Sequence, residues 1–184
     1  MGPDRDEVGD RFVTAISLTF DDAIDQHLDI VIPLLDQHEL CGTFYAHLSA
    51  PSLAGRRDSW QRAAQQGHEI GNHTIFHPAD AAKNSVRQGN ALNLYTPDRM
   101  LLEVEIANQW LDAFNGPQER SFAYPCSNLI LGNYGIVNRL LFSLGLRNTR
   151  LPAWVESRGL DIYSTRYNYA ALLHGLVVAA RGTG

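Results

Sequence analysis

The chain has 184 residues, of which 45% are hydrophobic and 19% are charged, and its net charge is −5 at pH 7. This length and apolar content suit one domain with a substantial core, so residues 1–184 are taken as a single domain in which 1–11 are disordered or extended. The acidic balance and the lack of a basic patch argue against nucleic acid as a partner.

No stretch of the sequence predicts insertion into a membrane. The longest apolar run, near 176–180, is far shorter than the roughly 20 residues that span a bilayer. The first eight residues, MGPDRDEV, are polar and acidic where a signal peptide is basic and then apolar. The compartment therefore stays open between a cytoplasmic protein and a trimmed secreted or cell-envelope protein, and the oligomeric state is also open.

Strand and helix signals alternate along the chain. Short apolar runs predict strands at 12–20, 42–49, 68–72, 121–124 and 146–149. Apolar periodicity and capping residues predict helices at 26–39, 58–66, 96–114 and 134–144. This alternation indicates parallel strands joined by crossover helices. In a barrel of that kind the carboxyl ends of the strands meet at one face, where active sites are built.

Carboxylates and imidazoles follow two of these predicted strands. Asp21 and Asp22 end the first strand, and His73 and His77 follow the third. Two histidines four residues apart can reach one cation if residues 74–76 form a helical turn. Two histidines and one carboxylate leave a coordination position open, which suits catalytic Zn²⁺ and non-haem iron alike.

Each of these signals has an ordinary explanation when it stands alone. A pair of histidines at this spacing is more often a surface or capping coincidence, and paired aspartates after a strand often cap a turn. The two signals together in one short chain are much less often coincidental. The additional aspartate favours hydrolysis, because water that attacks a carbonyl at a metal needs a neighbouring base.

Two motifs carry a resemblance to a known family. The sequence LTFDDA at 18–23 resembles the first motif, and HTIFHP at 73–78 the second, of the polysaccharide deacetylases, also called carbohydrate esterase family 4 or NodB-homology domains. The similarity runs from about residue 12 to the C-terminus. It implies a distorted, incompletely closed (β/α) barrel of the TIM-like, seven-stranded type.

The same resemblance implies roles for four side chains. Asp21 would be the catalytic base, and Asp22, His73 and His77 would bind one divalent metal. In this family the metal is usually Zn²⁺, with Co²⁺, Ni²⁺ or Mn²⁺ as alternatives. The implied substrate is an acetylated glycan or oligosaccharide.

A third motif, SFAYPCSN at 121–128, departs from the family pattern. Many members carry an arginine, which pairs with the base, where this chain has Ala123; here Tyr124 also replaces the first of two prolines. Losing that positive charge tends to raise the pKa of a carboxylate such as Asp21. Three arginines are candidates to approach from another direction: Arg120, Arg147 and Arg150.

The end of this motif supplies further candidate residues. The resemblance implies that Tyr124 and Pro125 contact substrate and that the backbone N–H of Cys126 donates to the oxyanion. A nucleophilic Cys126 thiol is a competing hypothesis, opposed by the lack of a histidine in a recognisable partner motif. The other cysteine, Cys41, is expected to be a small buried residue.

The C-terminal segment supports two interpretations. Leu172-Leu-His174 matches the family's last motif, whose histidine is the general acid. Residues 169–182, however, have the apolar periodicity of a helix that ends at glycine. We therefore expect His174 to lie in a helix and the barrel to lack its last strand within this chain, with His174 as general acid the alternative.

The expected activity is a metal-dependent hydrolase that removes acetyl groups from an N- or O-acetylated carbohydrate. The polar segment 83–95 is a candidate substrate-contacting loop, with a plain exposed connection as the alternative. His68 is expected to be structural, whereas His27, His38 and His47 are expected at the surface or in strands, without assigned chemistry.

Other functions remain open at this point. The chain could be a truncated or non-catalytic carbohydrate-binding relative, or an acetylxylan esterase or small-amide hydrolase on the same fold. A non-haem iron oxygenase would use the same ligands, but its usual antiparallel barrel conflicts with the predicted alternation. The sequence does not select the substrate.

Overall fold

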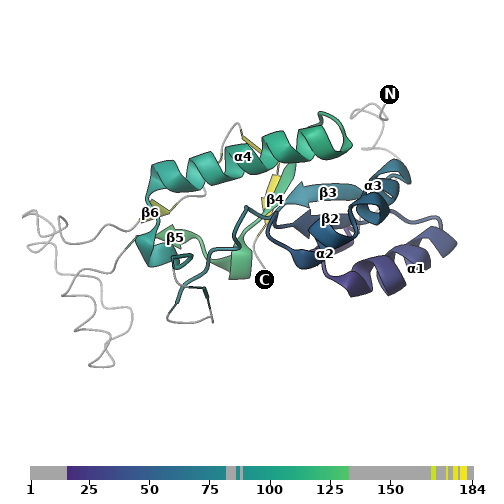
Figure 1. The fold of residues 1–184 in the computed structure, drawn as a ribbon, viewed down its shortest axis with the longest axis horizontal. Coiled ribbons are helices and arrows are strands. Elements are labelled where there is room, and N and C mark those ends of the chain that lie inside the picture. Colours follow the sequence, from purple (N-terminus) through teal and green to yellow (C-terminus); the bar gives the residue numbers. More distant parts are fainter. Residues whose placement is uncertain are drawn as a thin grey trace, which may run out of the picture.

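A computed structural model describes residues 16–81, 86–87, 89–132, 167–168, 173, 176–177 and 179–181. A curled sheet with helices along it dominates this part of the chain (Figure 1). Its strands, in spatial order, are β1 (Thr19–Asp21), β2 (Thr43–Ala46), β3 (Glu69–Asn72), β4 (Ser121–Ala123) and β7 (Ala179–Arg181).

All neighbouring strands of this sheet run parallel. The prediction of parallel strands is thereby confirmed, and a curled, incomplete barrel is the architecture. Its carboxyl ends are kept in line by the register, in which Ala46 pairs with Asn72 and Asn72 pairs with Phe122. A separate antiparallel pair consists of β5 (Ile130–Leu131) and β6 (Tyr167–Asn168).

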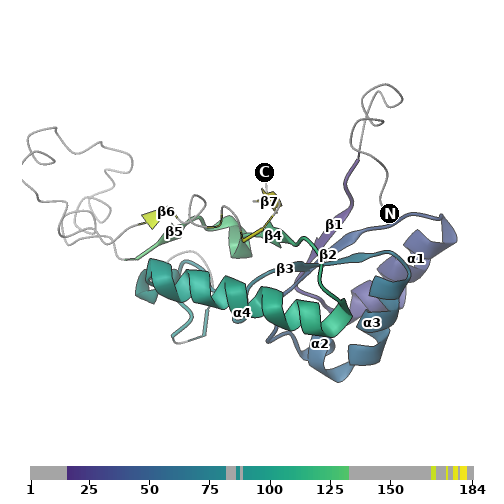
Figure 2. The same cartoon turned by 90° about the horizontal axis from the view of Figure 1, so that it is seen from above.

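Four α-helices and three shorter helical turns connect the described strands. The α-helices are α1 (Ile32–Gln37), α2 (Pro51–Gly55), α3 (Arg57–Gln65) and α4 (Pro97–Asn115). The shorter turns are a π-helix η2 (His27–Val31) and the 3₁₀ turns η3 (Leu92–Leu94) and η4 (Pro125–Ser127). In the view from above, α1 and α3 cluster at one end of the sheet while α4 extends alongside β3 (Figure 2).

Helix α4 begins where its sequence predicts. Thr96 is extended, and its hydroxyl accepts a hydrogen bond from the Arg99 N–H at 3.2 Å, which caps a donor that the helix leaves free. Pro97 occupies the first turn, where its missing N–H costs nothing. None of the described helices is long and apolar enough to cross a bilayer.

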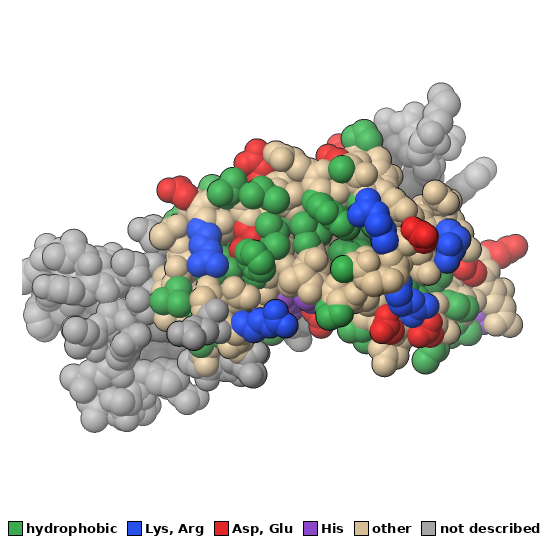
Figure 3. Space-filling view, viewed as in Figure 1, with side chains coloured by type: hydrophobic (Ala, Val, Ile, Leu, Met, Phe, Trp, Pro, Cys, Tyr) green, Lys and Arg blue, Asp and Glu red, His purple; other side chains and the backbone are tan. Residues whose placement is uncertain are grey.

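The core consists of two clusters of buried side chains. The first gathers apolar side chains from β2, β3 and all four α-helices around Phe44 and Trp60, whose indole N–H donates to the Ser52 hydroxyl at 3.2 Å. The second joins α4 to β4, with Val104 and Phe122 fully buried. Apolar side chains also reach the outer surface of α4, where Leu102 and Ile106 are exposed (Figure 3).

The structure corrects three predictions from the sequence. The helix expected at 169–182 is wrong at its end, because Ala179–Arg181 forms strand β7 beside β4. A short apolar run suits a strand and a helix alike, because periodicity alone does not separate the two. A parallel strand therefore does follow position 174 within this chain. Helix α2 was not predicted, and Cys41, expected to be buried, is exposed ahead of β2.

Some predictions fall outside the described residues. These are the helix at 134–144, the strand at 146–149, His174, Arg147 and Arg150. The seven-stranded form of the barrel likewise stays a prediction.

Arg120 has a structural role. It is 3% exposed and lies just before β4. Its guanidinium donates to the Ile70 carbonyl of β3 at 3.2 Å and to Asp112 at 2.9 and 3.2 Å. It also reaches the end of α4 through Asn115 Oδ1 at 2.8 Å and the Gly116 carbonyl at 2.7 Å. Arg120 is thus fully engaged in joining β3 to α4, which argues against it as a partner of the candidate base.

Replacing Arg120 should therefore destabilise the fold. Arg120→Ala would leave Asp112 and two carbonyl groups without their donor, so we expect the free energy of unfolding to fall by about 3 kcal/mol. Urea denaturation of the metal-free protein measures this loss. Arg62→Ala, at an exposed position of α3, should change stability by no more than about 0.5 kcal/mol; equal effects of the two changes would contradict the assigned role.

Candidate metal centre and its cavity

The three candidate metal ligands follow the carboxyl ends of β1 and β3. The Asp22 N–H donates to the Tyr45 carbonyl at 3.0 Å, and the His73 N–H donates to the Ala46 carbonyl at 3.2 Å. Both acceptors belong to β2, which lies between the two strands. The ligands from distant parts of the sequence are therefore placed by backbone pairing to consecutive residues of one strand.

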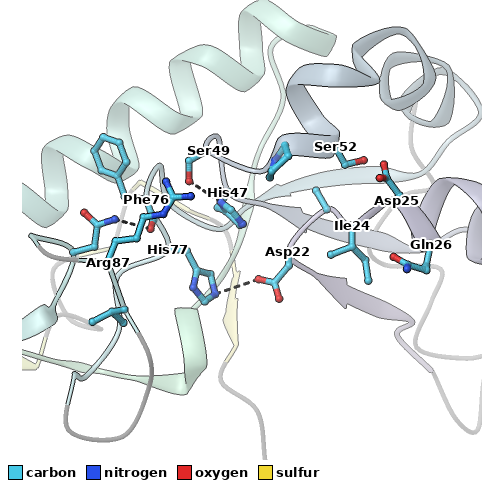
Figure 4. A pocket seen from close by; sticks show the side chains of 14 residues that line it. Asp22, Ile24, Asp25, Gln26, His47, Ser49, Ser52, Phe76, His77 and Arg87 are labelled. Carbon is cyan, nitrogen blue, oxygen red and sulfur yellow. Dashed lines mark hydrogen bonds and ion pairs between the residues drawn. The ribbon is translucent and has the colours of Figure 1, made fainter.

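Asp22, His73 and His77 each direct one ligand atom toward a common point. These three atoms all lie within 4.8 Å of one another. Asp22 Oδ1 is 3.2 Å from His77 Nε2 (Figure 4). It is 3.5 Å from His73 Nε2. Asp22 Oδ1 is buried yet accepts no hydrogen bond of good geometry, as expected of an atom whose lone pair serves another partner.

The His73 ring is fixed in one tautomer. His73 is 1% exposed, and its Nδ1 lies 2.8 Å from the Ala123 carbonyl oxygen. A carbonyl oxygen only accepts hydrogen bonds, so Nδ1 must carry the proton. The lone pair of Nε2 then faces Asp22 and is available to a metal, in the arrangement usual for histidine ligands.

The segment between the two histidines is a loop and not the helical turn that the spacing suggested. Thr74 has φ 70° and His77 has φ 53°, both in the left-handed region. Side chains hold this shape: Asn72 Oδ1 accepts from the Thr74 N–H at 2.7 Å, and Thr74 Oγ1 accepts from the His77 N–H at 3.0 Å. The other end of the Asn72 amide donates to the Val104 carbonyl of α4 at 3.0 Å.

The electrostatics suit a divalent cation. His73 and His77 hold the pKa of the Asp22 carboxyl well below its usual range, although partial burial acts in the opposite direction. Asp22 is therefore anionic at neutral pH. Two imidazole nitrogens and one carboxylate oxygen form the donor set of catalytic Zn²⁺ sites, so these residues fit such an ion.

Asp21 is the last residue of β1 and directly precedes Asp22. Asp22 has φ 76°, so the chain leaves the extended conformation between the two carboxylates. Both aspartates raise the pKa of the nearby His27, but burial outweighs them and lowers it. His27 packs against Phe20 and Phe44, so the expectation of a surface or strand position is wrong. The role of Asp21 as base stays a prediction.

The third motif bends sharply at the site. Cys126 is exposed and has φ 49° within η4, and partial desolvation and the nearby Asp22 raise the pKa of its thiol. A raised pKa disfavours the thiolate, which argues against a nucleophilic role. Tyr124 and Pro125 are buried, and the Tyr124 ring packs edge-on against Phe122. Contact of the Tyr124 ring with substrate would require it to leave the core.

An open cavity of about 590 Å³ lies beside the candidate ligands (Figure 4). Its walls come from residues 22–26, from the segment after β2, and from the loop that contains Arg87 and Asn90. Part of the loop predicted to contact substrate is thus at the cavity. Segment 82–85 and residue 88 lie outside the described residues.

His47 is a functional candidate that sequence reasoning missed. Its ring lines the cavity, lies 5.3 Å from the His77 ring between centroids, and has its Nδ1 2.9 Å from the Ser49 hydroxyl. Burial lowers the pKa of His47 to about 4, with His77 and His73 acting in the same direction, so the imidazole is neutral at pH 7. A lone histidine after a strand carries no sequence signal of this placement.

Comparison with known families agrees with this geometry. The family model described as Polysaccharide deacetylase matches residues 10–138, which is well over half of the chain. The chain belongs to the polysaccharide deacetylase family. No match was found among curated proteins.

The chain is also similar to several solved structures. Streptococcus pyogenes deacetylase PplD, in complex with acetate, is 19% identical with a TM-score of 0.51, over 73% of this chain and 54% of PplD. Bacillus subtilis PdaA, a family 4 carbohydrate esterase, is 22% identical with a TM-score of 0.45, over 59% and 42%. A CE4 family pseudoenzyme from Bacillus anthracis is 17% identical with a TM-score of 0.47, over 70% and 40%. The chain thus spans about half of each protein, or less.

The donor geometry predicts that each chain binds one divalent ion. Zn²⁺ at about 100 times its Kd should raise the unfolding free energy by about 2.7 kcal/mol. His73→Ala should abolish both the stoichiometric binding and the thermal shift, because it removes one of the three donors. Equilibrium dialysis with metal analysis measures the binding. His38→Ala, at an exposed position, should bind as the wild type does; loss of binding there too would argue against this centre.

Proposed function

We propose that this deacetylase-family chain is a metal-dependent hydrolase that removes acetyl groups from an N- or O-acetylated carbohydrate. The observation that carries the proposal is the meeting of Asp22, His73 and His77 at one point beside an open cavity, with Asp21 next in the chain. Zn²⁺ is the proposed ion, since its preferred ligands are those present here.

The reaction is the addition of water to the acetyl carbonyl. When bound, the metal ion polarises the carbonyl and lowers the pKa of water. Asp21 accepts the proton that the attacking water loses, which is the role of a general base. The Cys126 backbone N–H is the proposed donor to the oxygen that becomes negative.

Completion of the reaction requires an acid. The bond between the carbonyl carbon and the sugar nitrogen or oxygen breaks, and the leaving group takes up one proton to become an amine or an alcohol. His174 is the candidate from sequence and lies outside the described residues. Acetate and the deacetylated sugar are the products.

The cavity supports a carbohydrate as the substrate. Polar groups line it, among them the His47 imidazole, the Ser49 hydroxyl and the Asn90 amide. Such groups can donate to and accept from sugar hydroxyls. The proposed substrates are N-acetylated oligosaccharides such as chitin-like chains and peptidoglycan, with acetylxylan as the ester alternative.

A second candidate function is carbohydrate binding without turnover. It is favoured by Ala123, which stands where many family members have an arginine, and by Arg120, whose guanidinium is committed to β3 and α4. Metal binding without acetate release would select this alternative.

The first test of activity is acetate release from a panel of N- and O-acetylated glycans. With Zn²⁺ present, the wild type should release acetate, and a chelator should stop it. Asp21→Asn should lower kcat by about 10²-fold or more, because the general base is lost while the metal ligands remain. Asp58→Asn, at an exposed position at the start of α3, is the matched control and should retain full activity. Equal activity of Asp21→Asn and the wild type would refute the assigned base.

His47 should affect substrate binding more than the chemical step. Removing one neutral hydrogen-bonding group from the cavity wall should raise KM about tenfold, equivalent to about 1.4 kcal/mol, with a smaller change in kcat. Steady-state kinetics of His47→Ala and His47→Gln measure the two parameters separately. An unchanged KM in both variants would remove His47 from the substrate site.

A further inference from the structure

Glu103 is a buried carboxylate on α4 that no motif singled out. It is 4% exposed. Within the described part of the chain it forms no ion pair, so no cation compensates for its burial there. Burial of a carboxylate is costly unless hydrogen bonds satisfy it. The position of Glu103 therefore depends on the donors that it contacts.

Two backbone donors to Glu103 belong to the loop between the two candidate histidine ligands. Glu103 Oε1 accepts from the Ile75 N–H at 3.1 Å and from the Phe76 N–H at 3.0 Å. Hydrogen bonds to an ionised acceptor are stronger than neutral ones, and one oxygen here receives two of them. The Glu103 carboxylate thus holds the middle of the loop to α4.

The other amides of the loop are satisfied locally. The Thr74 N–H donates to Asn72, and the His77 N–H donates to Thr74. Each of these contacts joins residues no more than three positions apart in the sequence. Glu103 differs from them, because it lies 27 and 28 positions away from its two partners and belongs to a packed helix.

We propose that Glu103 is a positioning residue for the metal centre, an inference that rests on the proposed metal-dependent function. By fixing Ile75 and Phe76, it keeps the left-handed conformations of Thr74 and His77 and so holds the His77 imidazole toward Asp22. Glu103 touches neither the metal ligands' side chains nor the cavity. Glu103 instead holds the loop, before any metal binds, close to the conformation that metal binding requires.

The test compares Glu103→Ala and Glu103→Gln with Glu105→Ala, which removes an exposed carboxylate from the same helix. Zn²⁺ affinity is measured by competition with a chromophoric chelator. Glu103→Ala should weaken it about 10- to 100-fold, as the loss of outer partners of metal ligands typically does. Glu103→Gln should lose less, because its amide oxygen still accepts hydrogen bonds. Glu105→Ala should bind as the wild type does.

A second readout needs no metal. Hydrogen exchange of the Ile75 and Phe76 amides in the metal-free protein should be about tenfold faster in Glu103→Ala, while amides of β2 and β3 keep wild-type rates. Such a local change separates positioning from general loss of stability. If Glu103→Ala does not fold, Glu103→Gln decides the question with the same two measurements.

The outcomes distinguish this inference from the function on which it rests. In one outcome the wild type binds Zn²⁺, and the Glu103 variants have the same Zn²⁺ affinity and the same amide exchange rates as the wild type. That outcome overturns the positioning role alone. A wild-type chain that binds no Zn²⁺ overturns the metal centre and the positioning role together. Weaker binding and faster local exchange in the Glu103 variants, with Glu105→Ala unaffected, support both.

Discussion

Backbone pairing to strand β2 sets the positions of two candidate metal ligands, Asp22 and His73. Asp22 and His73 donate their own N–H groups to Tyr45 and Ala46, which are consecutive residues of β2. The spacing between those two carbonyls is a fixed dimension of an extended chain. The sheet therefore sets the separation of the Asp22 and His73 main chains, and the loop after β3 adds His77 to this frame.

The sheet can hold this alignment because strands β2 and β3 and helix α4 pack closely against one another. A Cβ added to Gly71 would lie 2.6 Å from the Tyr45 ring, so only glycine allows β2 and β3 to pair at this point with the ring in place. On the far side of β3, Asn72 is fully buried and donates to the Val104 carbonyl and to Asn108. Strand β3 is thus fixed both to β2 and to α4, next to the candidate ligand His73.

The sequence predicted those parts of the structure in which local chemistry is sufficient. The Thr96 cap and Pro97 mark the start of α4, and the alternation of strands and helices indicates a parallel sheet. The aspartate and histidine motifs indicate which side chains converge, because carboxyl ends of parallel strands share one edge. The spacing did not give the path between His73 and His77, whose left-handed residues depend on hydrogen bonds from side chains.

Other features depend on contacts between distant parts of the chain. The pattern of the last residues suits a helix, but pairing with β4 makes Ala179–Arg181 a strand. His47 and Glu103 belong to no sequence motif. Only the folded chain shows that His47 lines the cavity and that Glu103 accepts hydrogen bonds from the loop between His73 and His77. Sequence periodicity shows which face of a helix or strand a residue lies on. The roles of His47 and Glu103 depend instead on which other segment of the chain packs against that face.

The hydrogen bond from His73 Nδ1 to the Ala123 carbonyl has an evolutionary consequence. Its acceptor is a main-chain atom, so the tautomer of the ligand is independent of which side chain occupies position 123. A lineage could exchange that side chain, and with it the electrostatic surroundings of the candidate base Asp21, without changing the hydrogen bond that orients His73. The proposed metal site and the surroundings of the proposed base can therefore change independently in this architecture.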